Sequence, residues 1–106
     1  MHRVKLVVRL VQRGATAGGY VRQLQLPFVP YVGMKFEQGT SCALWEAAGN
    51  EELSPSIEEV VYDIAEAEIV CLFTVDKPLS SSLWQTLDFA THGKRSMELN
   101  TSATDR

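Results

Sequence analysis

The segment from Leu26 to Phe36 places two prolines and one glycine among seven large apolar residues. Each proline fixes φ and lacks a backbone donor, so the segment cannot form the interior of a helix or of a central strand. Gly33 can adopt a positive φ and let the chain turn. We therefore expect an apolar corner here, where one strand leaves the edge of a sheet and a short strand begins near 34–37.

The totals indicate one globular domain over residues 1–93, followed by a polar tail over residues 94–106. Hydrophobic residues make up 45% of the chain and charged residues 22%, which are ordinary globular values. No apolar run approaches the roughly 20 residues of a membrane helix, and residues 1–13 lack the apolar core of a signal peptide. These features predict a cytoplasmic protein with no membrane partner.

Residues 3–13 alternate apolar and charged side chains, as a long strand does. The face that carries the four basic residues of this segment also carries Val7 and Val11, so it is only half polar, and either solvent or a partner could cover it. The glycine-rich stretch 14–19 predicts a turn into a second strand over 20–26, which completes a hairpin. The residues of the predicted core face are Val4, Leu6, Val8 and Leu10.

Residues 57–63 and 68–75 are rich in strand-forming residues, and we expect them to pair as a second hairpin. Apolar spacing leaves a helix over 55–66 as the alternative. The Ser82–Gln85 pattern is typical of a helix N-terminus, and apolar residues follow at helical spacing. The sequence therefore predicts a C-terminal helix near 82–92.

These elements together predict an α+β fold. We expect a mainly antiparallel sheet of about five to six strands, arranged as a meander or a part-open barrel. The helix near 82–92 would lie across this sheet.

Charge is segregated along the chain. Six basic residues and no acidic residue lie in 1–36, whereas ten acidic residues and no basic residue lie in 37–76. We interpret this as basic strands beside acidic strands. The acidic balance, with a pI near 5.3, argues against nucleic acid as a partner.

No catalytic, metal-binding or cofactor-binding motif is present in the sequence. Cys42 and Cys71 lack the spacing of a zinc site, and both lie in apolar runs that favour buried, unreactive thiols. His92 suits a helix C-terminus better than a catalytic base. We therefore expect no cofactor and no metal, and we favour a protein that is not an enzyme.

The order of features resembles that of small uncharacterised bacterial proteins encoded by mobile integron gene cassettes. The residues that carry this resemblance are Leu26-Pro27-Phe28-x-Pro30, Gly33-Met34, Val60-Val61-Tyr62-Asp63 and the strand with Cys71. The resemblance covers residues 1–92 and implies a β-rich sheet with a C-terminal helix. It also implies frequent self-association and a pocket, and it implies no activity.

Two functional hypotheses follow. The preferred one is a binding module that forms a homodimer through an apolar aromatic surface around residues 28–45, made by Phe28, Tyr31, Phe36 and Trp45. The opposing reading is that these rings complete the core. The alternative function is a small-molecule binder or enzyme-like protein with a pocket between helix and sheet, lined by Arg22, Tyr62, Asp63, Phe73 and Trp84.

Overall fold

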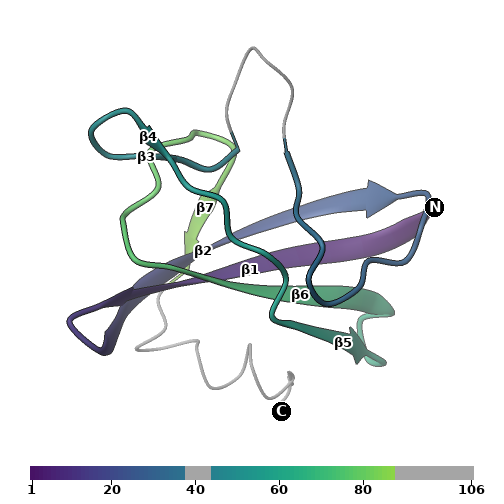
Figure 1. Ribbon diagram of the computed structural model, residues 1–106. Coiled ribbons are helices and arrows are strands. Elements are labelled where there is room, and N and C mark those ends of the chain that lie inside the picture. The colour runs from purple at the N-terminus through teal and green to yellow at the C-terminus, as the bar shows by residue number, and fades with distance from the viewer. Residues whose placement is uncertain (38–43, 88–106) are drawn as a thin grey trace.

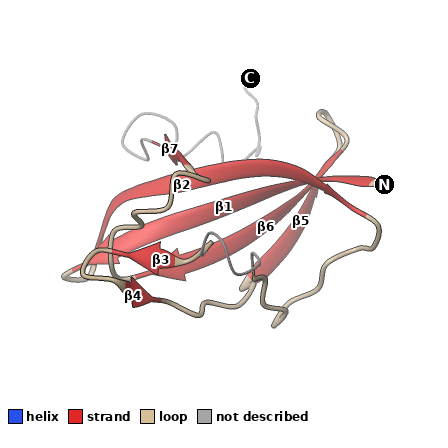
Figure 2. Cartoon of the chain, turned by 90° about the horizontal axis from the view of Figure 1, so that it is seen from above, coloured by secondary structure: helices blue, strands red, loops and turns tan. Residues whose placement is uncertain are grey.

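The computed structural model describes residues 1–37 and 44–87, and it shows a five-stranded sheet with a small two-stranded ribbon over one face (Figures 1 and 2). The five-stranded sheet has the order β5-β6-β1-β2-β7. Its strands are β1 (His2–Gln12), β2 (Ala15–Leu26), β5 (Glu59–Asp63), β6 (Glu68–Val75) and β7 (Gln85–Leu87). The ribbon consists of β3 (Glu46–Ala47) and β4 (Glu51–Glu52).

The prediction of an α+β meander or part-open barrel is wrong for this part of the chain. The described residues contain strands and no helix, and the sheet is mixed. β6 lies beside β1 and runs parallel to it, whereas the other neighbouring pairs are antiparallel. A parallel neighbour requires a crossover, and the long connection from β2 to β5 supplies it.

β1 and β2 form the predicted hairpin, but its turn is tighter than predicted. Gln12 pairs with Ala15, so the loop has two residues, Arg13 and Gly14, whose φ values are 55° and 78°. Two-residue loops with positive φ at both positions match the twist of the strands they join. Residues 15–19 therefore belong to β2 instead of the turn.

The predicted hairpin of 57–63 with 68–75 is confirmed, and the alternative helix over 55–66 does not form. β5 pairs with β6, from Glu59 opposite Leu72 to Asp63 opposite Glu68. The turn between them lacks glycine, and Ala67 takes a φ of 53°. The Asp63 carboxylate accepts a hydrogen bond from the Glu66 backbone N–H at 3.2 Å, which supports the turn.

The predicted C-terminal helix is wrong for the residues that the structure describes. Gln85–Leu87 form β7 and pair with Gly19–Val21 of β2. Ser82 is not a helix cap, and the Ser81 hydroxyl instead accepts the Leu83 N–H at 3.2 Å. Residues 88–92 lie outside the described ranges. Within those ranges, no helix is long and apolar enough to cross a bilayer.

The main core lies on one face of the sheet, beneath the connections that cross it. The predicted core face of β1 is confirmed, since its four apolar side chains are all buried. Residues 34–37 were predicted to form a strand and are irregular, yet Met34 and Phe36 pack on this core. The other buried members of the core are Leu44, Trp45, Ile57, Ile69, Cys71, Phe73, Val75 and Trp84.

Candidate functional site

The segment between β2 and the core connections exposes a set of large apolar side chains. Phe28 is 39% exposed, and Val29, Tyr31 and Val32 are 58–63% exposed. We call these four residues the apolar loop surface. Side chains of this type are usually withdrawn from water, so their exposure makes this segment a candidate binding surface.

Backbone contacts hold this segment in place. Pro30 is buried in the middle of it. Gly33 takes a φ of 94° and donates its N–H to the Ile57 carbonyl at 2.8 Å, while the Ile57 N–H donates to the Met34 carbonyl at 2.9 Å. The C-terminal end of the segment is thus anchored beside the start of β5. The buried ring of Pro30 lies between the exposed pairs Phe28–Val29 and Tyr31–Val32.

The other two predicted interface residues belong to the core. Trp45 is 2% exposed, and its indole Nε1–H donates to the Phe36 carbonyl at 2.9 Å. Its ring centroid lies 5.0 Å from that of Phe73, and the Phe36 ring is half-buried 6.2 Å from the same ring. The structure therefore places Phe28 and Tyr31 at the surface and assigns Phe36 and Trp45 to packing.

The five predicted pocket residues are not brought together. Phe73 and Trp84 are buried in the core, and the Trp84 indole donates to the Leu44 carbonyl at 2.8 Å. Tyr62 and Asp63 lie at the end of β5, whereas Arg22 lies on β2 opposite Leu6. Because Gln85–Leu87 form a strand, the described residues build no cleft between a helix and the sheet.

A second exposed region follows β5, an edge strand of the sheet. Val61 and Tyr62 are 37% and 58% exposed, and Ile64 in the adjoining turn is 84% exposed. Side chains alternate along the strand, so Glu59, Val61 and Asp63 share one face of the sheet. Apolar and acidic side chains are therefore mixed along this edge.

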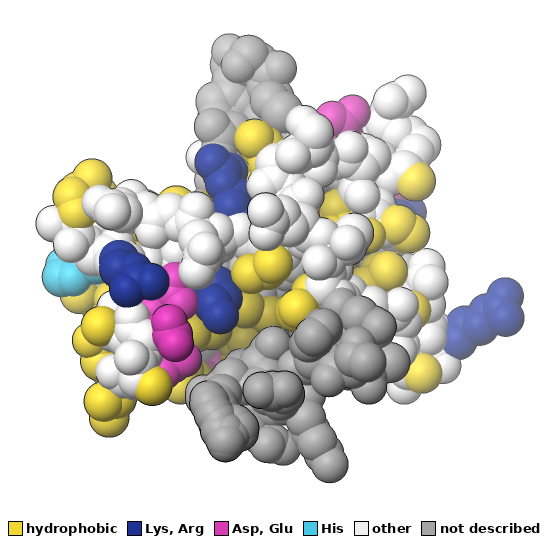
Figure 3. All heavy atoms as spheres, turned by 180° about the vertical axis from the view of Figure 1, so that it is seen from behind, with side chains coloured by type: hydrophobic (Ala, Val, Ile, Leu, Met, Phe, Trp, Pro, Cys, Tyr) yellow, Lys and Arg dark blue, Asp and Glu magenta, His cyan; other side chains and the backbone are white. Residues whose placement is uncertain are grey.

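The sheet face opposite the core carries a second, smaller apolar cluster. Figure 3, which views the molecule from behind, shows apolar side chains next to basic and acidic ones. Val7, Val70 and Leu72 are buried in this cluster, and Val21 and Leu87 pack against them. On the half-polar face of residues 3–13, the central valine, Val7, is therefore shielded from solvent. Val11, near the end of the strand, is half-buried.

Glu68 forms a polar corner on this second face. Its side chain is 3% exposed, its Oε2 accepts a hydrogen bond from Gln23 Nε2 at 3.0 Å, and its Oε1 lies 3.9 Å from Lys5 Nζ. Nearby, Arg3 donates from Nη1 to the Glu66 carbonyl at 2.9 Å. Basic β1 thus lies next to the single acidic side chain of β6, and a buried carboxylate needs such partners. The more acidic β5 pairs with β6, so the expected pairing of basic with acidic strands is met only at Glu68.

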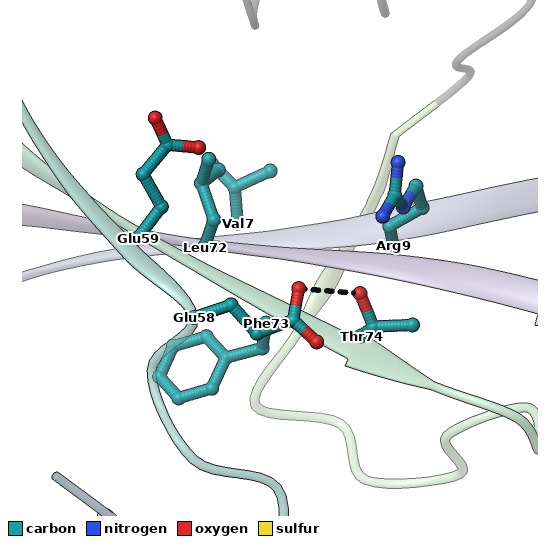
Figure 4. Close-up of a pocket in the computed structure, with 7 residues that line it drawn as sticks. All are labelled: Val7, Arg9, Glu58, Glu59, Leu72, Phe73 and Thr74. Atoms are coloured by element: carbon teal, nitrogen blue, oxygen red, sulfur yellow. Dashed lines mark hydrogen bonds between the residues drawn. The ribbon is translucent and has the colours of Figure 1, made fainter. Parts of the chain in front are cut away.

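A hollow of about 110 Å³ lies on the second face near the start of β5 (Figure 4). Val7, Leu72, Glu59 and Arg9 project to one side of the sheet, and Phe73 projects to the other. Thr74 Oγ1 donates to Glu58 Oε1 at 2.9 Å at its margin. Ligand pockets usually enclose about 300–1,000 Å³, so this hollow is smaller than a typical ligand site. A larger hollow of about 410 Å³ is lined by Leu53, Pro55 and Val75 among others, and it contains none of the five predicted pocket residues.

Cys71 is a buried thiol whose pKa is raised by burial from its ordinary value of 9.0 to about 12. It therefore has almost no nucleophilic thiolate at neutral pH. Cys42 and His92 lie outside the described residues. Over 1–37 and 44–87, no three His, Cys, Asp or Glu side chains gather closely enough to hold a metal ion.

Sequence reasoning missed the exposure of Val29, Val32, Val61 and Ile64. Val29 and Val32 stand one residue before and two residues after Pro30, inside the segment that the prolines exclude from regular structure. The prolines exclude a central strand there, but they do not predict which side chains are exposed, because Met34 and Phe36 of the same segment pack on the core. Ile64 follows the last residue of β5 and had no signal of exposure either.

No protein-family model, curated protein or solved structure matches this chain.

Proposed function

We propose that this protein is a non-enzymatic interaction module that forms a homodimer through the apolar loop surface. The observation that carries the proposal is the exposure of Phe28, Val29, Tyr31 and Val32 on a segment that is anchored by the buried Pro30 ring and by hydrogen bonds at Gly33 and Met34. A fixed apolar surface loses little conformational freedom on binding, which favours association. Phenylalanine and tyrosine are also among the residues that carry the most binding energy at interfaces.

The charges around the surface favour a second copy as the occupant. Residues 26–36 contain no acidic side chain and one basic side chain, Lys35. Its Nζ donates to Ser54 Oγ at 3.1 Å. In a two-fold dimer each residue meets the same patch on the partner, so a nearly uncharged apolar patch avoids like-charge repulsion.

Sedimentation equilibrium across protein concentrations tests the proposal. We expect the unmodified protein to be a dimer at tens of micromolar, with a dissociation constant on the order of micromolar. The double variant Phe28→Ser/Tyr31→Ser should weaken the dimer at least tenfold, because it removes two apolar anchors. A matched control, Tyr62→Ser, changes an exposed ring outside the surface and should leave the dimer intact.

Two results would contradict the proposal. The first is a strictly monomeric unmodified protein up to about 100 µM, well above the expected dissociation constant. The second is a dimer that both Tyr62→Ser and the double variant leave unchanged. Circular dichroism of each variant establishes that the sheet is retained.

We also infer a cytoplasmic location, since Cys71 is a buried free thiol and reducing compartments preserve such thiols. The resemblance to integron cassette proteins remains a prediction. Comparison of the chromosomal neighbourhood of the gene with known cassette arrays would test it.

A further inference from the structure

β5 has a free side in the part of the chain that the structure describes. It is the first strand in the order of the sheet, and β6 is its neighbour. In an antiparallel pair, alternate residues direct both N–H and C=O away from the partner strand. The outer side of Glu59–Asp63 therefore presents backbone donors and acceptors to whatever lies next to it.

The chain itself already uses this outer side just before β5 begins. Glu58 donates its N–H inward to the Leu72 carbonyl at 2.8 Å. The preceding residue, Ile57, instead exchanges two hydrogen bonds with Gly33 and Met34, at 2.8 and 2.9 Å. The backbone of Gly33 and Met34 thus lies beside residue 57, on the side away from β6. The outer side of residues 59–63 is the continuation of this position along the strand.

The side chains along this edge define the chemistry of a segment that could extend it. Residues 58–66 include four acidic side chains and no basic one: Glu58, Glu59, Asp63 and Glu66. Glu59 and Asp63 lie on one face of the sheet with Val61 between them. Tyr62 lies on the other face and is 58% exposed.

We propose that the outer edge of β5 binds an extended basic and apolar segment of another protein, which adds to the sheet as a sixth strand. Backbone hydrogen bonds would provide affinity, as in other strand-addition complexes, and alternate side chains would provide specificity. Cations two residues on either side of an apolar residue would face Glu59 and Asp63 across Val61. The recognised segment would therefore contain one basic residue, then three apolar residues, then a second basic residue.

Charge argues against the other occupants of this edge. If two copies paired antiparallel through β5 and centred on Val61, Glu59 of each copy would face Asp63 of the other. Like charges directly opposite each other destabilise strand pairing. Nucleic acid would meet the same four carboxylates. The proposed site adjoins the apolar loop surface but uses other residues, and the peptide experiment is read without reference to the proposed dimer.

Fluorescence anisotropy with a labelled, end-blocked peptide tests the proposal. The probe is a seven-residue peptide with lysines at its second and sixth positions and Val-Val-Tyr between them. We expect saturable binding with a dissociation constant below about 1 mM, weakening as salt is added. Replacing both lysines by glutamate, or the central valine by proline, should weaken binding at least tenfold.

Protein variants and chemical-shift mapping locate the binding. Glu59→Lys should weaken the lysine peptide at least tenfold and improve binding of the glutamate peptide. The matched control Glu52→Lys reverses an exposed charge on β4 and should change affinity less than twofold. In labelled unmodified protein, the amide shifts of residues 59–63 should move most.

Several outcomes would overturn the inference. The first two are equal binding of the lysine and glutamate peptides, and no binding of either peptide up to about 1 mM. The third is a set of peptide-induced amide chemical-shift changes centred on Lys5, Val7 and Val21. Concentration-dependent shifts of residues 59–63 without peptide would show that a second copy takes the edge. The peptide comparison uses unmodified protein, so it stays decisive even if Glu59→Lys fails to fold.

Discussion

Phe28 and Tyr31 differ sharply from Phe36 and Trp45, although all four rings come from one stretch of the chain. The first two are 39% and 63% exposed, whereas Trp45 is 2% exposed and Phe36 is half-buried against the core. Phe28 and Tyr31 lie on either side of a buried proline in a turning segment. Phe36 and Trp45 follow at the point where the chain crosses the sheet above Phe73.

The difference teaches that exposure here follows the path of the backbone. Trp45 gains both a partner for its N–H and two ring contacts, with Phe73 and Trp84 at centroid distances of 5.0 and 5.1 Å. Tilted ring pairs at such distances add stability beyond burial alone. Tyr31 has no ring partner among the described residues, so it contributes little to the fold and remains available for binding.

The sharpest test of this contrast is removal of the buried indole. Trp45→Ala should lower the free energy of unfolding by about 3–5 kcal/mol, since it leaves a cavity and orphans the Phe36 carbonyl. Urea denaturation measures the change. A decrease in the free energy of unfolding of less than about 1 kcal/mol would mean that Trp45 stabilises the fold no more than the exposed rings do.

Phe36 should give an intermediate result because its ring is half-buried. Phe36→Ala is expected to cost about 1–3 kcal/mol, less than the tryptophan change. The same denaturation series compares the two variants. An effect as small as that of an exposed ring would mean that the contact with Phe73 does not stabilise the fold.

The pH dependence of stability tests how completely the core excludes water around Cys71. The folded pKa of about 12 exceeds the ordinary value of 9.0, so above pH 9 the unfolded chain loses a proton that the folded chain keeps. Stability from this group is therefore full below pH 9 and falls between 9 and 12. The stability advantage over Cys71→Ala should shrink by about 1–2 kcal/mol between roughly pH 8.5 and 10.5. An unchanged difference would mean that the thiol is hydrated.

Tyr31 should give the smallest effect on folding. At concentrations where the protein is monomeric, Tyr31→Ser should change the free energy of unfolding by no more than about 0.5 kcal/mol. Thermal denaturation of dilute protein checks this value. A loss of several kcal/mol would show that the ring supports the fold, and the proposed division between the two pairs of rings would fail.

The elements with a clean local pattern were predictable from sequence. Every second residue from Val4 to Leu10 is apolar, and β1 forms over them with the expected core face. Residues 68–75 carry β-branched and apolar side chains, and β6 has those bounds. The β1–β2 hairpin and the β5–β6 hairpin follow from such neighbouring strands, because sequence-local pairing needs little long-range information.

The remaining errors arose where distant partners decide the structure. Leu83, Trp84 and Leu87 have the spacing of one apolar face of a helix. In the structure, Trp84 is buried in the core and donates a hydrogen bond to the Leu44 carbonyl, whereas Leu87 packs on the opposite face of the sheet. The free edge of β2 supplied the backbone partner that turned 85–87 into a strand. The buried state of Trp45 likewise depends on Phe73, 28 positions further along the chain, which local spacing cannot reveal.

Hydroxyl-radical footprinting at low and high protein concentration would separate the two pairs of rings, because it reports the solvent exposure of individual aromatic side chains. We expect rapid oxidation of Phe28 and Tyr31 in dilute protein and their protection at tens of micromolar, where the proposed dimer would form. Trp45 should stay protected at every concentration. Oxidation of Tyr31 that does not change with concentration, or of Trp45 as fast as Tyr31, would contradict the account.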